Sequence, residues 1–419
     1  MSQSQNRYEV KITDQHIRAV IIHAFESSPS FRNVLYEVFG KNIVLETDLF
    51  IQHKTLDNGV VNTVYSLELF RGRDQEQPHG PCLELILKLS SPNWKYLKTL
   101  NEVHVMKVLH SLQLPNLKCP QIFTYDTSAD FIGYEYILME KCRGVALSEI
   151  YETLSFHERK GYINQIAKIR GELSSLKLLM VDENDQELKE PELLFGSIQE
   201  MQVIDQENKL IRVKIGPNCD TKNGPFNTFN EYLIKTIEYR MKGLNESLIE
   251  LGSSTAISHY KELFNRVIHY LRRNAIKVRR DEFQLCHYDL TPNNTLIDPH
   301  SKTITGVIDW EWACLTVLDE DMNEILNNWA LCDEEKEYVK TCLNSEIDFL
   351  SIDVHRCEDY WKSHKERTIF FDAASWILRL TCYKEWFLGK PYEVLLEYVQ
   401  GIKIGVEKFF EEHEEWNSK

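Results

Sequence analysis

The spacing of apolar residues changes near Gly144, and this change limits the folds that the chain can adopt. Before Gly144 many segments have the short, alternating pattern of strands, whereas beyond it apolar residues recur mostly at helical spacing. A β-rich front and an α-rich back predict two lobes with a crevice between them. We therefore expect an α+β fold in which residues 1–140 form one domain and residues 141–419 form the other.

The front region has the pattern of a small antiparallel sheet accompanied by helices. Two short helices are expected between Asp14 and Phe39, with an interruption near Pro29. A longer helix is expected from Pro92 to about Leu112. The expected strands cover residues 49–54, 60–70, 83–89, 121–125 and 134–139. Asp57-Asn58-Gly59 predicts a hairpin between the first two strands, because Asn and Gly tolerate the positive φ of tight turns.

The back region is expected to be mainly helical, with an insertion and one strand-rich segment. Helical spacing covers residues 147–154, 157–179, 228–251 and 257–273, and it returns from Asp319 to the end. The polar and acidic segment of residues 181–227 contains a hairpin-like pattern, which predicts an insertion between helices. Residues 283–310 are again rich in strand patterns.

The charge balance excludes some classes of partner. Lys and Arg number 48 against 64 Asp and Glu, so the formal net charge at pH 7 is −16. Nucleic-acid binding is therefore not expected, because affinity for the phosphate backbone requires clustered cations. The sequence contains no run of about 18 apolar residues, so no membrane span is predicted. The ten cysteines include no C-x-x-C pair, which is typical of reduced thiols in a cytoplasmic protein.

The segment from Cys286 to Trp312 carries the strongest chemical pattern. His287, Asp289 and Asn294 form an H-x-D-x4-N arrangement, and Asp309 follows fifteen residues after Asn294. Two short strands between Asn294 and Asp309 predict a hairpin that brings these two residues together at one end. Hard oxygen ligands at such a point suit Mg²⁺, which prefers one or two carboxylates together with nucleotide phosphates.

This segment resembles the catalytic segment of the aminoglycoside phosphotransferase and choline kinase superfamily, which shares the protein-kinase fold. Residues 308–313, Ile-Asp-Trp-Glu-Trp-Ala, are similar to the aminoglycoside phosphotransferase-type family. The resemblance implies a bilobal protein-kinase-like fold. It makes Asp289 the catalytic carboxylate that accepts the proton of the substrate hydroxyl, and Asn294 and Asp309 the ligands of Mg²⁺. His287 is then expected to brace the loop as a buried histidine.

The front region contains the remaining parts that such a kinase needs. Lys88 lies on an expected strand between Leu87 and Leu89, where an inward-facing Lys is costly without an anionic partner. Glu102 follows fourteen residues later on the expected helix. This order matches the Lys–Glu pair with which similar kinases hold the α- and β-phosphates.

Two further segments correspond to the nucleotide-binding parts of the family. The stretch from Gly59 to Tyr65 has the position of the phosphate-covering loop. Within it, the sequence Asn-Thr-Val-Tyr that begins at Asn62 is similar to the sequence of the family at this place. The stretch from Leu138 to Gly144 is similar to the adenine-contacting hinge. The resemblance implies that backbone groups of Glu140 and Cys142 contact the base.

Together these features predict an enzyme that transfers the γ-phosphoryl group of ATP or GTP, with Mg²⁺, to a hydroxyl of a small molecule. An acidic chain would suit a cationic amine as acceptor. Two alternatives remain: a non-catalytic pseudokinase that binds nucleotide or a protein partner, and a choline, ethanolamine or sugar kinase of the same superfamily. Glu311 follows Asp309-Trp310 where a protein kinase has Gly, which argues against a regulated protein kinase.

Overall fold

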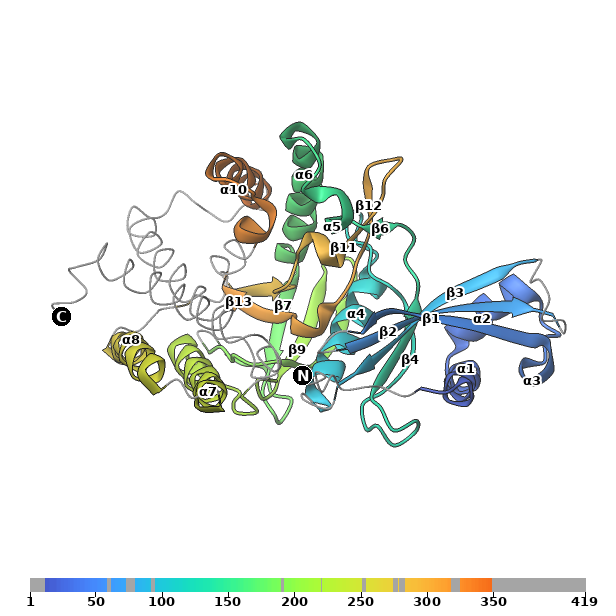
Figure 1. The fold of residues 1–419 in the computed structure, drawn as a ribbon, viewed down its shortest axis with the longest axis horizontal. Coiled ribbons are helices and arrows are strands. Elements are labelled where there is room, and N and C mark those ends of the chain that lie inside the picture. Colours follow the sequence, from blue (N-terminus) through green and yellow to red (C-terminus); the bar gives the residue numbers. More distant parts are fainter. Residues whose placement is uncertain are drawn as a thin grey trace, which may run out of the picture. The chain divides into compact units, whose positions relative to one another are not determined.

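The computed structural model describes residues 12–58, 62–72, 80–91, 95–189, 192–219, 221–250, 254–273, 278, 283–317 and 325–348 (Figure 1). The chain divides into two compact units. The first, called the sheet unit, comprises Arg7–Ile150 and Asn293–Trp312. The described part of the second, called the helical unit, lies within Tyr151–Pro292 and Ala313–Lys419.

An antiparallel sheet forms the centre of the sheet unit. Among the described residues its strand order is β1-β2-β3-β5-β4. The strands are β1 (Leu49–Asn58), β2 (Asn62–Arg71), β3 (Cys82–Ser90), β4 (Ile122–Asp126) and β5 (Tyr136–Glu140). β3 lies between β2 and β5, so Lys88 pairs with Val64 on one side and Ile137 on the other. The expected front sheet is confirmed.

Three short helices precede the sheet and pack against it (Figure 1). They are α1 (Asp14–Ser27), α2 (Pro29–Phe39) and α3 (Leu45–Asp48). Ser28 ends α1 and caps α2 by accepting a hydrogen bond from the N–H of Phe31, and Pro29 occupies the first helical position. The apolar faces of α1 and α2 share one buried cluster with the sheet, formed by Ile17, Ile21, Phe31, Leu35, Leu67, Leu87 and Leu138 among others.

The long helix of the sheet unit, α4 (Leu97–Leu112), begins later than its sequence predicts. The expected start at Pro92 was wrong, and residues 92–94 lie outside the described residues. Tyr96 has a left-handed backbone conformation with φ 69°, and its N–H donates to Glu135 Oε1 at 2.6 Å. This side-chain bond satisfies a backbone donor at a position where the chain is not yet helical.

A hairpin that comes late in the sequence belongs to the sheet unit. β11 (Thr295–Asp298) pairs with β12 (Thr303–Val307), and β11 also pairs with β6 (Val145–Ala146). Gly144 precedes β6 with φ +113°, and a Cβ there would lie 2.2 Å from the carbonyl oxygen of Ile297. The sheet unit therefore continues to Ile150 and includes the hairpin, whereas the sequence suggested a boundary at residue 140.

The described part of the helical unit contains long helices and two small sheets. A single turn, α5 (Ser148–Tyr151), precedes it, where a helix over residues 147–154 was expected. Residues 177–179 form part of a strand, so the expected helix over residues 157–179 was too long. The described elements of the helical unit are α6 (Phe156–Ser174), β7 (Lys177–Val181), β8 (Ile198–Asp205), β9 (Leu210–Ile215), α7 (Phe229–Glu250), α8 (Ser254–Arg273), β10 (Phe283–Cys286), β13 (Cys314–Val317) and α10 (Asp333–Asp348).

The expected hairpin in the insertion is present as β8 and β9, and β7 joins it in parallel with β9. Short apolar runs such as Lys177–Val181 fit either a helix or a strand, and here pairing with β9 decides the outcome. Along β9, buried and half-buried residues alternate, as expected for a strand with one face toward the interior. The helices expected beyond residue 348 lie outside the described residues.

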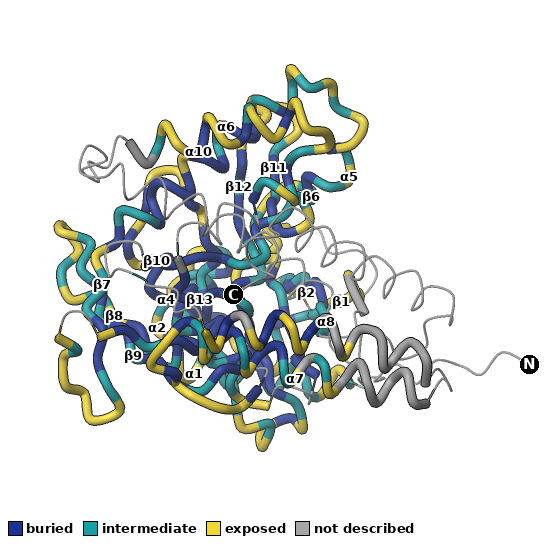
Figure 2. Tube along the Cα trace, turned by 90° about the vertical axis from the view of Figure 1, so that its left-hand side faces the viewer, coloured by how far each residue is buried: buried dark blue, intermediate teal, exposed yellow. Residues whose placement is uncertain are grey.

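Helices α6 and α10 lie side by side in both ribbon and tube views (Figures 1 and 2). A buried ion pair between Arg159 of α6 and Glu335 of α10 connects them. Burial alone would raise the pKa of Glu335, but its hydrogen bond with Arg159 lowers it below the ordinary value. The Glu335 carboxyl group therefore remains charged at neutral pH.

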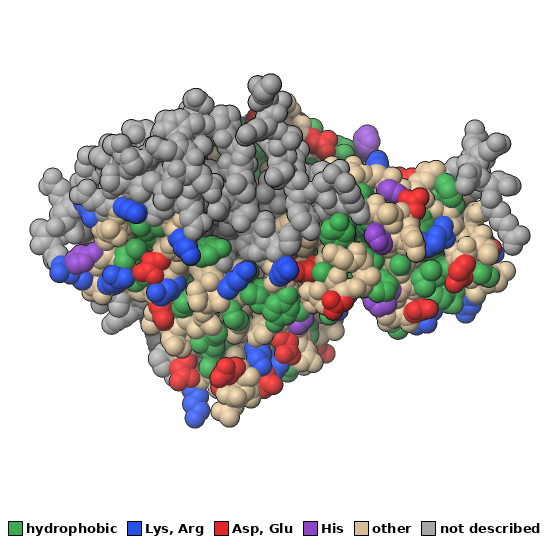
Figure 3. Space-filling model, turned by 60° about the horizontal axis from the view of Figure 1, so that its bottom comes forward, with side chains coloured by type: hydrophobic (Ala, Val, Ile, Leu, Met, Phe, Trp, Pro, Cys, Tyr) green, Lys and Arg blue, Asp and Glu red, His purple; other side chains and the backbone are tan. Residues whose placement is uncertain are grey.

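The surface of the protein carries side chains of both charges. On the face shown in Figure 3, Lys and Arg side chains of the described residues stand beside Asp and Glu side chains. Within the described part of the chain, no helix has the length and apolar character that crossing a membrane requires.

The packing of α2 on the sheet can be tested by shortening Phe31. This side chain has 0% exposure and its ring lies 5.1 Å from that of Phe123. Phe31→Ala should lower the free energy of unfolding by about 3–5 kcal/mol, because it leaves a cavity in a close-packed core. Leu56→Ala, at a side chain with 50% exposure, should change it by less than about 0.5 kcal/mol. Urea unfolding of both variants measures the difference, and equal losses would contradict the packing.

Candidate active site

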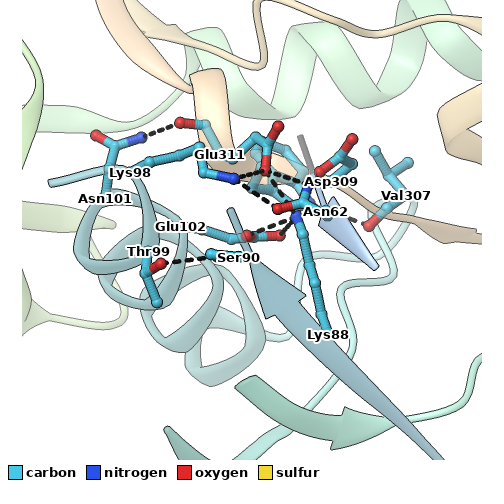
Figure 4. A network of polar contacts seen from close by, with 11 residues as sticks. Asn62, Lys88, Ser90, Lys98, Thr99, Asn101, Glu102, Val307, Asp309 and Glu311 are labelled. Atoms are coloured by element: carbon cyan, nitrogen blue, oxygen red, sulfur yellow. Dashed lines mark hydrogen bonds and ion pairs between the residues drawn. The ribbon is translucent and has the colours of Figure 1, made fainter. Parts of the chain in front are cut away.

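Lys88 lies at the centre of a cluster of charged side chains in the sheet unit (Figure 4). Its Nζ donates to Glu102 Oε1 at 2.9 Å and to Glu102 Oε2 at 2.7 Å. The same nitrogen donates to Asp309 Oδ1 at 2.6 Å and lies 3.0 Å from Glu311 Oε2. Lys88 is 5% exposed, so these carboxylates replace most of the water that an ammonium group needs.

Helix α4 directs polar residues toward this cluster. Lys98, Asn101 and Glu102 stand at positions i, i+3 and i+4 and therefore share one face of the helix. All three are buried, and the segment Trp310–Trp312, the 3-10 helix η4, packs against α4. A buried polar face on a helix requires partners of its own. η4 supplies them for Lys98 and Asn101, and Lys88 supplies them for Glu102.

Glu311 connects the residues of this cluster. Its Oε2 accepts a hydrogen bond from Asn62 Nδ2 at 2.7 Å and lies 3.1 Å from Lys98 Nζ. Lys98 Nζ also donates to Asn62 Oδ1 at 2.5 Å. Asn101 Nδ2 donates to the backbone carbonyl of Glu311 at 3.1 Å. One carboxylate thus contacts the start of β2, the face of α4 and the lysine of β3.

The turn that carries Asp309 has a constrained backbone. Asp309 has φ +67°, which is unusual for a residue other than glycine. The indole N–H of Trp310 donates to the carbonyl of Val307 at 3.0 Å, and the N–H of Ile308 donates to the carbonyl of Asn294 at 3.0 Å. The expected hairpin between Asn294 and Asp309 is therefore present, and its open end brings their backbones together.

The cluster holds more negative than positive charge. Burial lowers the pKa of Lys88, but Asp309, Glu102 and Glu311 raise it well above its ordinary value. Burial, partly offset by Lys88, raises the pKa of Glu102 to about 7. Burial and the charge of Glu311 also raise the pKa of Asp309. The three carboxylates outnumber the two ammonium groups of Lys88 and Lys98, so an additional positive charge in this cluster would be stabilised.

Glu311 differs from the other two carboxylates. Burial alone would raise its pKa, but Lys88 and Lys98 lower it to about 2. Its charge is therefore well compensated within the protein.

Asp309 is the carboxylate of this cluster that could contribute to a site for a divalent cation such as Mg²⁺. Ligand oxygens of Glu102, Asp309 and Glu311 lie within 4.8 Å of one another. The side chain of Asp309 is 31% exposed, whereas those of Glu102 and Glu311 are 2% exposed. Among these three, Asp309 is thus the carboxylate that an incoming ion can reach, and its raised pKa marks a charge that a cation would stabilise.

The other residues expected to bind nucleotide have varied positions. Asn62 begins β2, and its amide is engaged by Glu311 and Lys98. Gly59 lies outside the described residues. Glu140 ends β5 with an exposed side chain, and its N–H donates to the carbonyl of Gln121 at 2.9 Å. Cys142 follows as a half-buried thiol whose pKa burial raises to about 12, so it remains protonated.

Asp289 and His287 belong to the helical unit, in the loop that follows β10. His287 is 1% exposed, and its Nδ1 accepts from the N–H of Asp289 at 3.3 Å. The N–H of Thr291 donates to the carbonyl of Asp289 at 2.9 Å. Tyr288 has φ +65°, and its N–H donates to Cys286 Sγ at 3.1 Å. Local hydrogen bonds thus hold a strained loop in one shape.

Trp329 supports the same loop from another part of the helical unit. Its side chain is fully buried, and its Nε1–H donates to the carbonyl of Leu290, next to Asp289, at 2.7 Å. The hydroxyl of Tyr151 donates to the carbonyl of Trp329 at 2.5 Å. The backbone beside Asp289 is therefore fixed by a residue forty positions later.

Sequence reasoning did not assign Lys98, Asn101 or Trp329 to the site, and it did not place Glu311 beside Lys88. For Lys98 and Asn101 a pattern was available, since they share a helical face with Glu102, which was expected to point inward. No spacing rule connects Trp329 to Leu290, because their contact depends on tertiary structure.

Comparison with known proteins identifies the family of the chain. Residues 54–339, more than half of the chain, match the model of the phosphotransferase enzyme family. The chain belongs to this family. No curated protein sequence matches it.

Solved structures resemble this family member at low sequence identity. An ethanolamine kinase from Plasmodium vivax is 14% identical with a TM-score of 0.51, and the match covers 95% of each chain. A Ralstonia eutropha JMP134 protein assigned to the aminoglycoside phosphotransferases is 12% identical with a TM-score of 0.52, over 96% of this chain and 98% of that one. These similarities confirm the expected protein-kinase-like α+β fold.

Loss of Lys88 should expose the excess of negative charge. Lys88→Met should lower the free energy of unfolding by about 3–5 kcal/mol at pH 8, because it removes the positive partner of buried carboxylates. The loss should shrink at pH 6, since the pKa of Glu102, already raised to about 7, rises further without Lys88 and the protonated carboxyl carries no charge. Urea unfolding at both pH values measures this. Lys95→Met, at an exposed lysine, serves as the control, and a loss that does not depend on pH would contradict the assignment.

Proposed function

We propose that this phosphotransferase family member transfers the γ-phosphoryl group of ATP or GTP to a hydroxyl of a small molecule. The observation that carries the proposal is the position of Lys88, held by both oxygens of Glu102 and by Asp309. A buried lysine fixed in this way can present its charge to phosphate oxygens, and phosphoryl transfer depends mainly on positioning and charge neutralisation.

Each residue has a defined part in this proposal. Lys88, oriented by Glu102, holds the α- and β-phosphates, while Asp309 and Asn294 hold Mg²⁺. Bound Mg²⁺ would neutralise phosphate charge that develops during transfer. Asp289 orients the acceptor hydroxyl and takes its proton, and His287 holds the loop through the N–H of Asp289. Backbone groups of Glu140 and Cys142 contact the base.

The acceptor is a small molecule that carries a hydroxyl group. The acidic balance of the chain suits a cationic amine, and the fold is similar to that of an ethanolamine kinase and of a protein assigned to the aminoglycoside phosphotransferases. A coupled assay of nucleotide consumption should therefore compare aminoglycosides, choline, ethanolamine, sugars and amino-acid alcohols. Consumption of ATP or GTP that depends on one class identifies the acceptor, whereas nucleotide binding without consumption across this panel favours a pseudokinase.

The role of Asp289 predicts a selective loss of turnover. Asp289→Ala should lower kcat about 100- to 10,000-fold, the usual contribution of a general base, while the Kd for Mg-ATP changes by less than about threefold. Steady-state kinetics and calorimetry measure the two effects. Asp333→Ala, at an exposed aspartate of the same unit, should leave both unchanged. Retained turnover in Asp289→Ala would reject the assignment.

Trp329 should influence the same step indirectly. Trp329→Phe keeps most of the ring but removes the donor to the carbonyl of Leu290, which leaves a buried acceptor without this bond. We expect kcat to fall about tenfold with little change in the KM for nucleotide, because the backbone beside Asp289 loosens. An equal change in both constants, or none, would show that this bond does not position Asp289.

A further inference from the structure

The network around Glu311 contains a second buried lysine, Lys98 (Figure 4). A contribution to stability does not explain why this lysine is buried. Lys98 is 1% exposed, and its nitrogen contacts Glu311 Oε2 and Asn62 Oδ1. Burying such an ion pair removes both charges from water, and well-packed apolar residues in its place are often as stable or more stable. A buried pair beside a proposed phosphate site therefore calls for a functional explanation.

The distances show that two lysines share one carboxylate oxygen. Glu311 Oε2 lies 3.0 Å from Lys88 Nζ and 3.1 Å from Lys98 Nζ. Lys88 also contacts Glu102 and Asp309, so three carboxylates compete for its charge. Without Lys98, the attraction of Glu311 would act on Lys88 with less compensation.

Asn62 fixes the arrangement from a third element. Its Nδ2 donates to Glu311 and its Oδ1 accepts from Lys98. The donor of the amide therefore faces a carboxylate, and its acceptor faces an ammonium group. Asn62 is the first residue of β2, which pairs with β1. The network therefore joins the start of β2 to the turn that carries Asp309.

We propose that Lys98 is a positioning residue that acts as the counter-ion of Glu311 and thereby leaves Lys88 free to engage nucleotide phosphates. The inference rests on the proposed function, because it assigns Lys98 a role at the same nucleotide site. It makes a specific statement about charge: Lys98 improves nucleotide binding only as long as Glu311 is negative.

The test uses the full chain and measures binding rather than turnover. Calorimetry gives the Kd for Mg-ATP and for Mg-GTP in the wild type, Lys98→Gln, Glu311→Gln and the double variant. Gln at position 98 removes the charge but can still hydrogen-bond to Asn62. Lys95→Gln, an exposed lysine three residues earlier, is the matched control and should bind as the wild type does.

Lys98→Gln should weaken nucleotide binding about tenfold. The double variant should bind more tightly than Lys98→Gln, because Glu311→Gln removes the charge that draws Lys88 away. A structural role alone predicts the opposite order, since two separate defects add. Unchanged binding in Lys98→Gln, or a double variant that binds no better than Lys98→Gln, would overturn the inference.

Two further outcomes have distinct meanings. If the wild-type protein binds neither nucleotide, the proposed function and this inference are both overturned. If the wild type binds nucleotide but the Lys98 variants do not behave as expected, only the inference about Lys98 is overturned. If Lys98→Gln does not fold, as judged by circular dichroism, Asn101→Ala tests the same network without a change of charge. It removes the bond to the carbonyl of Glu311 and should weaken binding about twofold to fivefold, and unchanged binding would then count against the network.

Discussion

The buried ammonium group of Lys88 is the interaction on which the site depends. A charge on the central strand of a sheet is stable only when carboxylates surround it, and these carboxylates come from α4 and from the turn after β12. The requirement therefore brings together segments that lie more than two hundred positions apart. It also fixes which face of α4 must point toward the sheet, since Glu102 cannot reach Lys88 from any other face.

The sequence was sufficient to predict the larger elements of the fold. Strands with apolar residues at alternate positions, such as Cys82–Ser90, and helices with a cap, such as the pair on either side of Ser28, were predicted within a few residues. The errors occurred where local patterns are ambiguous. Lys177–Val181 fits a helix as well as a strand until its partner β9 is known, and the start of α4 depends on a bond from Tyr96 to Glu135, a residue of another segment.

The candidate site could be predicted only where its residues belong to sequence motifs similar to those of the family or have a regular spacing along one helix or strand. Lys88, Glu102 and Asp309 could be proposed in this way, and the structure places them in contact. The contacts of Glu311 with Lys98 and Asn62 could not be derived, because each joins residues from separate elements and none has a fixed separation along the chain.

Gly144 gives the fold a point of fragility that is separate from its chemistry. Any side chain at this position would collide with the backbone of Ile297, and its Cβ would also lie 2.9 Å from the Thr305 hydroxyl. The strands affected are those whose open end carries Asn294 and Asp309. A mutation screen would therefore score Gly144 among the inactivating positions, although glycine contributes no functional group there, and mutational intolerance alone would misassign it as an active-site residue.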